Sequence, residues 1–195
     1  MNTAAWPIFG VSLTSDREFV RFWDRLYTGY NEEVYQRNIR RPLTAEQIEA
    51  LFVWKNGGPL STKKRRSIRP YLSGGERIGR DAAADELRRF LTKPGGTVWR
   101  VFWLHLQHPE RYPIYDQHVH RAMAFLLGWD DLEIPSGGSA KVRAYLESYL
   151  QFFDRFAGCN RRQVDRALWS FGRFLKPECN REAFREAVPE PPDQH

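Results

Sequence analysis

One carboxylate in this chain stands in a setting that suits chemistry. Asp116 follows a Pro-Ile-Tyr run and precedes Gln-His-Val, where an apolar helical pattern begins. A carboxylate at the start of a helix is held rigidly by backbone amides, and it can stabilise a developing positive charge or orient a water molecule. The alternative is capping alone, because aspartate is a favoured residue at helix starts.

A second feature lies upstream of this aspartate. Pro94, Gly95 and Gly96 form a turn signal, and Thr97 is the expected N-cap of the apolar helix that follows. Backbone N–H groups at a helix start bind anions, and glycine lets a phosphate group approach closely. We therefore expect Gly95, Gly96 and Thr97 to contact phosphate, with Lys93 beside them.

The order of these features resembles the helix-hairpin-helix DNA glycosylase superfamily, which includes the 8-oxoguanine and adenine glycosylases. The resemblance rests on the glycine hairpin, the apolar helix after it, and the segment Pro113–Val119 that carries Asp116. It covers mainly residues 91–123. Two features depart from the family pattern: the two glycines are adjacent, and Tyr115 is an additional residue before the aspartate.

The resemblance implies an enzyme that rotates one nucleotide out of duplex DNA and releases its damaged or modified base, with Asp116 as the essential carboxylate. Members that also cleave the DNA strand carry a lysine early in the helix after the hairpin. The matching positions here are Thr97 and Val98, so the resemblance implies a glycosylase without lyase activity. The iron–sulfur cluster of some members needs four cysteines, whereas this chain has only Cys159 and Cys179, and no cofactor is expected.

Aromatic residues make up 14% of the chain and supply candidates for a base pocket. A flipped base stacks between aromatic side chains. For Trp99 and Trp103, which fall at helical spacing, packing in the core is the competing explanation. No histidine spacing demands a metal ion, and no metal site is expected. The full set of candidates is Trp54, Trp99, Trp103, Tyr112, Tyr115 and His118.

The balance of charge favours an anionic partner. The formal net charge is +6, and nucleic acid is the commonest partner of such a chain. The densest cationic run is Lys63, Lys64, Arg65 and Arg66. Such a run either contacts phosphates and releases counterions, or it is a solvated helix start. Double-stranded DNA is the expected partner.

Hydrophobic periodicity predicts an all-α fold, and no pair of strands is evident. We expect one helical domain over residues 1–195, with one or two lobes and with the hairpin and the aspartate segment at about residues 76–128. Residues 188–195 are expected to fray, and Trp6, Ile8 and Phe9 to pack an N-terminal arm. The expected helices are Ser15–Tyr30, a helix opened by the capping box at Thr44 and stopped at Asn56, Glu76–Leu91, Val98–Leu106, a helix from Asp116 to Leu127, Ser139–Phe156, Arg161–Lys176 and Asn180–Ala187.

Other function classes remain open at this point. No apolar run is long enough to span a membrane, and the low cysteine content and lack of a signal peptide predict a cytoplasmic protein. One alternative is a non-catalytic DNA- or RNA-binding module that uses the hairpin for phosphate contact. Another is a helical interaction protein whose basic surface binds RNA or an acidic partner.

Overall fold

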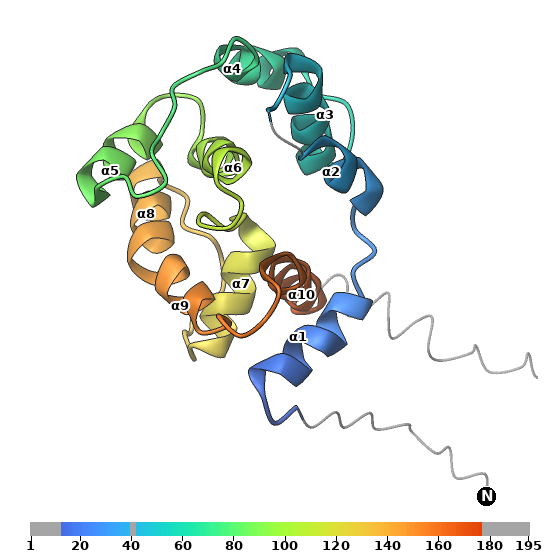
Figure 1. The fold of residues 1–195 in the computed structure, drawn as a ribbon. Coiled ribbons are helices and arrows are strands. Elements are labelled where there is room, and N and C mark those ends of the chain that lie inside the picture. Colours follow the sequence, from blue (N-terminus) through green and yellow to red (C-terminus); the bar gives the residue numbers. More distant parts are fainter. Residues whose placement is uncertain (1–12, 40–41, 177–195) are drawn as a thin grey trace, which may run out of the picture.

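The computed structural model describes residues 13–39 and 42–176, and it confirms the all-α prediction (Figure 1). The described residues contain no strand. The helices are α1 (Asp16–Arg25), α2 (Glu32–Asn38), α3 (Ala45–Asn56), α4 (Thr62–Leu72), α5 (Ala84–Thr92), α6 (Thr97–Gln107), α7 (Gln117–Leu126), α8 (Gly138–Arg143), the π-helical segment η1 (Ala144–Tyr149), α9 (Leu150–Asp154) and α10 (Arg161–Phe174).

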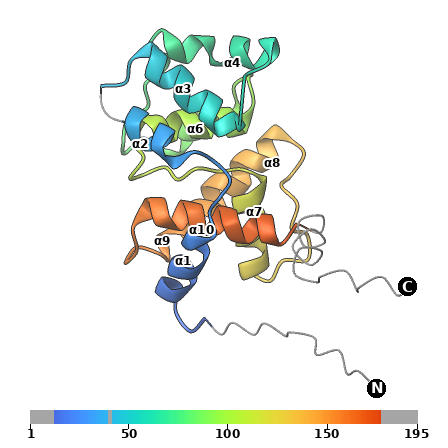
Figure 2. The ribbon, with the colours of Figure 1, turned by 90° about the vertical axis from the view of Figure 1, so that its right-hand side faces the viewer.

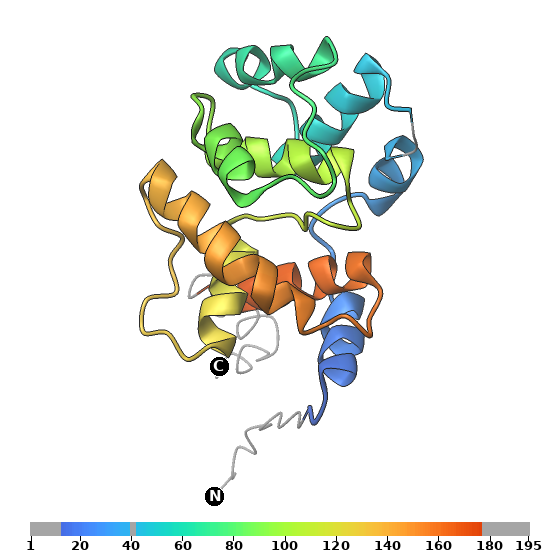
Figure 3. The ribbon, with the colours of Figure 1, turned by 60° about the vertical axis from the view of Figure 1, so that its left-hand side comes forward.

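The helices gather into two groups. Helices α2–α6 form the upper group of Figure 2 and Figure 3, and α1, α7, α9 and α10 form the lower group. Helix α10 packs along both α1 and α7, while α8 contacts α5 and α6 of the upper group. The chain passes between the groups at residues 26–31 and again at residues 108–116. Both passages bring side chains to the junction of the two groups.

The predicted helix starts can be compared with the residues that cap α3 and α6 in the structure. The Thr44 hydroxyl accepts a hydrogen bond from the Gln47 amide, and the Gln47 side chain accepts one from the Thr44 amide, which completes the predicted capping box. The prediction of Thr97 as an N-cap is wrong. Gly96, with φ at 91°, is the N-cap of α6, and Thr97 is the first helical residue. A positive φ favours glycine, so the adjacent glycines set this turn.

The predicted helix Glu76–Leu91 begins later than expected. Residues 73–83 are irregular, and α5 starts at Ala84. Side chains of α6 supply hydrogen bonds that a helix would otherwise make: the Trp103 indole donates to the Glu76 carbonyl (2.9 Å), and the Ile78 amide donates to the Gln107 side chain (2.9 Å). These two backbone groups of the loop are therefore satisfied without helical structure.

The predicted helix Ser139–Phe156 is largely confirmed, because α8, η1 and α9 follow one another without a break over residues 138–154. Its π-helical middle places Tyr145 and Tyr149 against Tyr115, with ring centroids 5.5 and 5.1 Å apart. All three tyrosines are fully buried. This cluster supports the loop that leads into α7.

Some predicted features lie outside the described residues. They are the N-terminal arm with Trp6, Ile8 and Phe9, the helix Asn180–Ala187, Cys179, and the tail at 188–195.

The crossing of α7 and α10 allows no side chain at Gly172. A Cβ atom there would lie 1.8 Å from the carbonyl oxygen of His118, at the start of α7. We expect Gly172→Ala to lower the free energy of unfolding by about 3 kcal/mol, because the backbones must separate. Urea denaturation measures this change. Gly158→Ala is the matched control, since no atom lies within 4 Å of its Cβ position; equal stability of the two variants would contradict the close crossing.

Candidate functional site

Asp116 is held at the start of α7 by the helix itself. Its Oδ1 accepts hydrogen bonds from the backbone amides of His118 (2.9 Å) and Val119 (3.2 Å). The preceding Tyr115 is buried, and its hydroxyl is hydrogen-bonded to Nδ1 of His120 at 2.7 Å. These contacts fix both the carboxylate and the residue before it.

The second carboxylate oxygen is bound by a lysine from another helix. Nζ of Lys55, in the last turn of α3, lies 2.5 Å from Oδ2 of Asp116. The two side chains are only 7% and 12% exposed. Burial alone would raise the pKa of Asp116, but the Lys55 ammonium and the Val119 amide outweigh it and lower that pKa below its ordinary value. Asp116 is therefore ionised at neutral pH.

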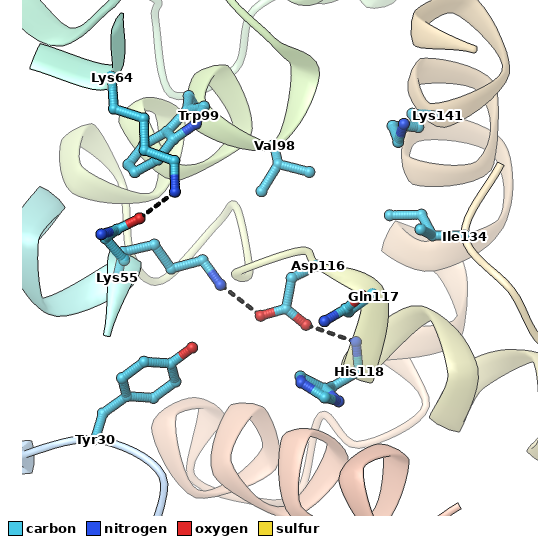
Figure 4. Close-up of a pocket in the computed structure, with 11 residues that line it drawn as sticks. Tyr30, Lys55, Lys64, Val98, Trp99, Asp116, Gln117, His118, Ile134 and Lys141 are labelled. Atoms are coloured by element: carbon cyan, nitrogen blue, oxygen red, sulfur yellow. Dashed lines mark hydrogen bonds and ion pairs between the residues drawn. The ribbon is translucent and has the colours of Figure 1, made fainter. Parts of the chain in front are cut away.

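A pocket of about 320 Å³ opens beside this ion pair (Figure 4). Asp116 contributes the only carboxylate among the lining residues, while three lysines contribute cations. The residues come from both helix groups and from the passages between them. The lining residues are Tyr30, Lys55, Asn56, Lys64, Val98, Trp99, Asp116, Gln117, His118, Ile134 and Lys141.

Two of the lysines have only uncharged partners. Nζ of Lys64 donates to the side-chain carbonyl of Asn56 (2.5 Å) and lies 5.9 Å from the ring centre of Trp99. Nζ of Lys141 donates to the Ser136 carbonyl at 2.9 Å. Within the described residues no carboxylate pairs with either ammonium. The pocket is therefore cationic overall.

His118 forms part of the pocket floor next to Asp116. Its ring packs edge-on against Trp169 with centroids 5.1 Å apart. Burial lowers the pKa of His118 below its ordinary value, so its imidazole is neutral at pH 7. A neutral imidazole adds no positive charge to the pocket but offers a hydrogen-bonding nitrogen.

The glycine hairpin directly precedes the first turn of α6, which lines this pocket. Gly95 and Gly96 have φ of 118° and 91° and are exposed, while Val98 and Trp99 of the next turn line the pocket. The Arg100 guanidinium donates to the Lys93 carbonyl at 2.8 Å and braces the turn from inside. The two exposed glycines therefore precede the pocket wall in the chain without lining the pocket, and Thr97 is buried.

The predicted cationic run forms the start of α4 and is exposed. Arg65 pairs with Glu49 at 2.7 Å, and Lys93 pairs with Glu76. Arg66 lines a hollow of about 350 Å³ together with Pro94 and Gly95 of the hairpin. The run and the hairpin thus belong to one continuous part of the surface.

The aromatic candidates divide into two sets. Trp99 and His118 line the pocket. The other four lie in the core: the Trp103 indole and the Tyr112 hydroxyl bind backbone carbonyls, and Tyr115 is sealed beneath η1. Trp54 packs on Tyr35. The structure therefore brings together Asp116, Trp99, His118 and Lys64 in one pocket. It places Gly95 of the hairpin with Arg66 in a separate hollow, and it leaves Trp54, Trp103, Tyr112 and Tyr115 outside the pocket.

Sequence reasoning missed Lys55, Tyr30 and Lys141. Lys55 stands in the last turn of α3, just before Gly57, where a cation is favourable for the helix dipole and needs no further explanation. No spacing in the sequence connects these residues to Asp116. Only the packing of the two helix groups reveals that they share a pocket.

Comparison with protein-family models, curated protein sequences and solved structures finds no match for this chain. The described helices are all too short or too polar to cross a membrane. Across residues 13–39 and 42–176, no group of three or more histidine, cysteine, aspartate or glutamate side chains is arranged to hold a metal ion.

The buried Lys55–Asp116 ion pair is expected to contribute to the stability of the folded protein. In Asp116→Asn the amide oxygen still caps α7, so this variant removes mainly the charge that faces Lys55. We expect it to lower the free energy of unfolding by about 3 kcal/mol, because a buried ammonium is left uncompensated. Lys55→Met should cost a similar amount. The double variant should lose less than the sum of the two, and chemical denaturation of all four proteins measures this coupling. Additive losses would show that the two charges do not interact.

Proposed function

We propose that this protein is a DNA N-glycosylase that releases a damaged or modified base without cleaving the strand. The observation that carries the proposal is an ionised, rigidly held Asp116 that lines a pocket together with the first turn of the helix after the glycine hairpin. The resemblance of the hairpin and the Pro113–Val119 segment to the helix-hairpin-helix glycosylases points the same way.

The reaction requires what this carboxylate offers. Breaking an N-glycosidic bond builds positive charge on the sugar, and an ionised carboxylate stabilises that charge. Both oxygens of Asp116 already accept hydrogen bonds, from Lys55 and from the α7 amides. A carboxylate has further lone pairs, so Asp116 can also orient the attacking water.

The exposed cations support DNA as the partner. Lys63, Lys64 and Arg65 occupy the first turn of α4, where the helix dipole disfavours positive charge. Helix stability therefore does not explain the run, whereas contact with phosphates does. Lys64 and Lys141 line the same pocket and come from the upper group and from α8, so a strand entering the pocket passes between positive side chains.

Lys55 brings a primary amine into the pocket, but its contact with Asp116 argues against strand cleavage. Lyase chemistry needs a neutral amine with a free electron pair to attack the sugar. Nζ of Lys55 is already bound to Oδ2 of Asp116 at 2.5 Å, so it is not free to attack a sugar. We therefore propose base release alone. This agrees with the absence of a lysine at Thr97 and Val98, the positions where strand-cleaving members of the family carry one.

One observation favours the non-catalytic alternative. The buried ion pair and the helix cap give Asp116 a complete structural role, as expected of a module that only binds DNA. Binding without base release would support this alternative.

A base-release assay tests the proposal. Duplexes that carry 8-oxoguanine, uracil, alkylated purines, mismatched adenine, or hydroxymethylated or glucosylated cytosine are incubated with the protein and then treated with alkali. We expect strand breaks that depend on alkali, and we expect Asp116→Asn to abolish them while DNA affinity changes less than about twofold. Circular dichroism confirms that the variant is folded. If the variant were as active as the unchanged protein, Asp116 would not be the catalytic carboxylate. Strand breaks that form without alkali would show lyase activity.

The salt dependence of binding tests the cationic run separately. We expect replacement of Lys63, Lys64 and Arg66 by serine to reduce the slope of log Kd against log salt by about 2 to 3, because each lost phosphate contact changes it by about 0.9. Arg65→Ser is the control, since Glu49 already holds that side chain. Fluorescence anisotropy at several salt concentrations measures both. An unchanged slope in the triple variant would show that the run is solvated surface that does not contact DNA phosphates.

A further inference from the structure

A second hollow opens between α4, α5 and the glycine hairpin. Its volume is about 350 Å³, and it shares no lining residue with the pocket of Asp116. Two helices nevertheless contribute to both spaces. Helix α4 places Lys64 in the pocket and Arg66 in the hollow. Helix α6 places Trp99 in the pocket (Figure 4) and the next residue, Arg100, in the hollow. The two spaces are therefore neighbours along the starts of these helices.

The hollow contains a buried guanidinium that lacks an anionic partner. Arg100 is only 9% exposed, and among the described residues no carboxylate pairs with it. Its Nε donates to the Lys93 carbonyl at 2.8 Å, and its Nη1 lies 3.5 Å from the Tyr71 hydroxyl. The Phe90 ring, 5.5 Å from Cζ, adds a cation–π contact but no negative charge. A buried charge is costly unless an opposite charge accompanies it, so Arg100 is prepared for an anion.

The remaining terminal nitrogen of Arg100, Nη2, is its free donor. It makes no hydrogen bond with the described residues, yet it is not sealed from solvent. Gly95 lies next to it, because a Cβ atom on Gly95 would be 3.3 Å from Nη2. Both residues line the hollow. The φ of Gly95 is 118°, which favours glycine, and the space beside Nη2 is therefore free of a side chain.

The other polar groups in the wall also favour an anion. Arg66 is exposed, and no carboxylate in the described part of the chain pairs with it. Burial raises the pKa of Tyr71, so its hydroxyl stays protonated and can donate a hydrogen bond. Glu76 is the only carboxylate among the lining residues, and Lys93 pairs with it. The hollow therefore carries two positive charges that no neighbouring side chain neutralises.

The positions of these donors select a phosphate group. Arg100 comes from α6, while Arg66 and Tyr71 come from different turns of α4, so the donors approach a ligand in the hollow from different directions. A phosphate group has several acceptor oxygens that point apart. The two oxygens of a carboxylate lie in one plane and match a single guanidinium fork. Phosphate therefore uses the donors of this hollow more completely than a carboxylate would.

We propose that this hollow binds one phosphate group through Nη2 of Arg100, the guanidinium of Arg66 and the hydroxyl of Tyr71. The source is the DNA backbone, because a strand whose nucleotide enters the pocket of Asp116 continues along the starts of α4 and α6 and carries a neighbouring phosphate into the hollow. This site differs from the expected contact with the hairpin amides, since a side chain next to Gly95 binds the anion. The phosphate site stands on the geometry of Arg100, and its DNA source rests on the proposed function.

Inorganic phosphate tests the site in the full-length protein, without DNA. Nitrogen-15 NMR spectra are recorded at constant ionic strength, with Arg100→Lys to assign the Nε signal of Arg100. We expect this signal and the Gly95 amide signal to shift and to saturate as phosphate is added, because the anion contacts the guanidinium beside the hairpin. The Nε signal of Arg121, which is bound to Glu133, should not shift. Shifts of Arg100 that do not saturate overturn the site.

Two substitutions on α4 test which side chains hold the phosphate. Arg66→Gln should weaken phosphate binding about threefold, because an exposed guanidinium contributes a screened charge. Arg69→Gln is the matched control, since Arg69 is exposed on the same helix but does not line the hollow. Equal effects of the two changes would show only general attraction to a basic surface and would overturn the proposed site.

Competition with a short undamaged duplex tests the DNA source. We expect the duplex to shift the same Arg100 signal. Fluorescence anisotropy should show that phosphate, exchanged for chloride at constant ionic strength, weakens DNA binding in the unchanged protein but not in Arg100→Lys. Arg100→Lys itself should lower DNA affinity about tenfold, because lysine keeps the charge but lacks the guanidinium fork. Arg69→Gln should change DNA affinity less than about twofold, as expected of a single exposed charge.

The outcomes separate the site from its source. If phosphate saturates the hollow but does not compete with DNA, the DNA source is overturned and the site binds free phosphate. If circular dichroism shows that Arg100→Lys is unfolded, Arg66→Gln takes its place in the competition experiment. Neither measurement requires base release, so failure of the glycosylase proposal and failure of the phosphate site are distinguishable.

Discussion

The geometry of the site depends on one buried ion pair between the two helix groups. Lys55 comes from α3 of the upper group and Asp116 from the start of α7 in the lower group, and their charged atoms are 2.5 Å apart. Removing two charges from water is costly, and each is tolerated only in the presence of the other. The pair therefore sets how closely the end of α3 approaches the start of α7, and the pocket of Asp116 lies along this junction.

A second contact between the groups supports the same junction from behind. Arg162 of α10 pairs with Glu32 at 2.6 Å and stacks over Tyr35 and Trp54, whose ring centres lie 4.3 and 5.1 Å from the guanidinium. Burial alone would lower the pKa of Arg162, but Glu32 raises it, so the cation is stable inside the protein. Trp54 is thus held by Arg162 and also packs against the rings of Tyr30, Tyr35 and Phe102. This explains why Trp54 is a core residue rather than a wall of the pocket.

Sequence patterns predicted the parts of this structure that depend on nearby residues. The capping box at Thr44, the cap at Asp116 and the apolar face of α10 are all local, and each was found where expected. The irregular stretch 76–83 was not foreseen, because the side chains of α6 that bind its backbone are distant in sequence. The same limit applies to the site. Asp116 and the hairpin have local signatures, whereas Lys55 reaches Asp116 across 61 positions of sequence and looks like an ordinary helix-end lysine.

The electrostatics of the pocket explain why a DNA-processing carboxylate would need a buried lysine. Phosphates of a bound strand would raise the pKa of a nearby carboxyl group and drive it toward the neutral acid. Lys64, which is exposed, and Lys141, which is half-buried, offset this only in part, because solvent and salt screen them. Lys55 is 7% exposed and in direct contact, so its charge is screened far less. In the proposed enzyme, Lys55 would keep Asp116 ionised at the moment when DNA brings negative charge to the site. In a module that only bound DNA, the same pair would join the two helix groups and Asp116 would cap α7, and the ionised state of Asp116 would have no role beyond these contacts.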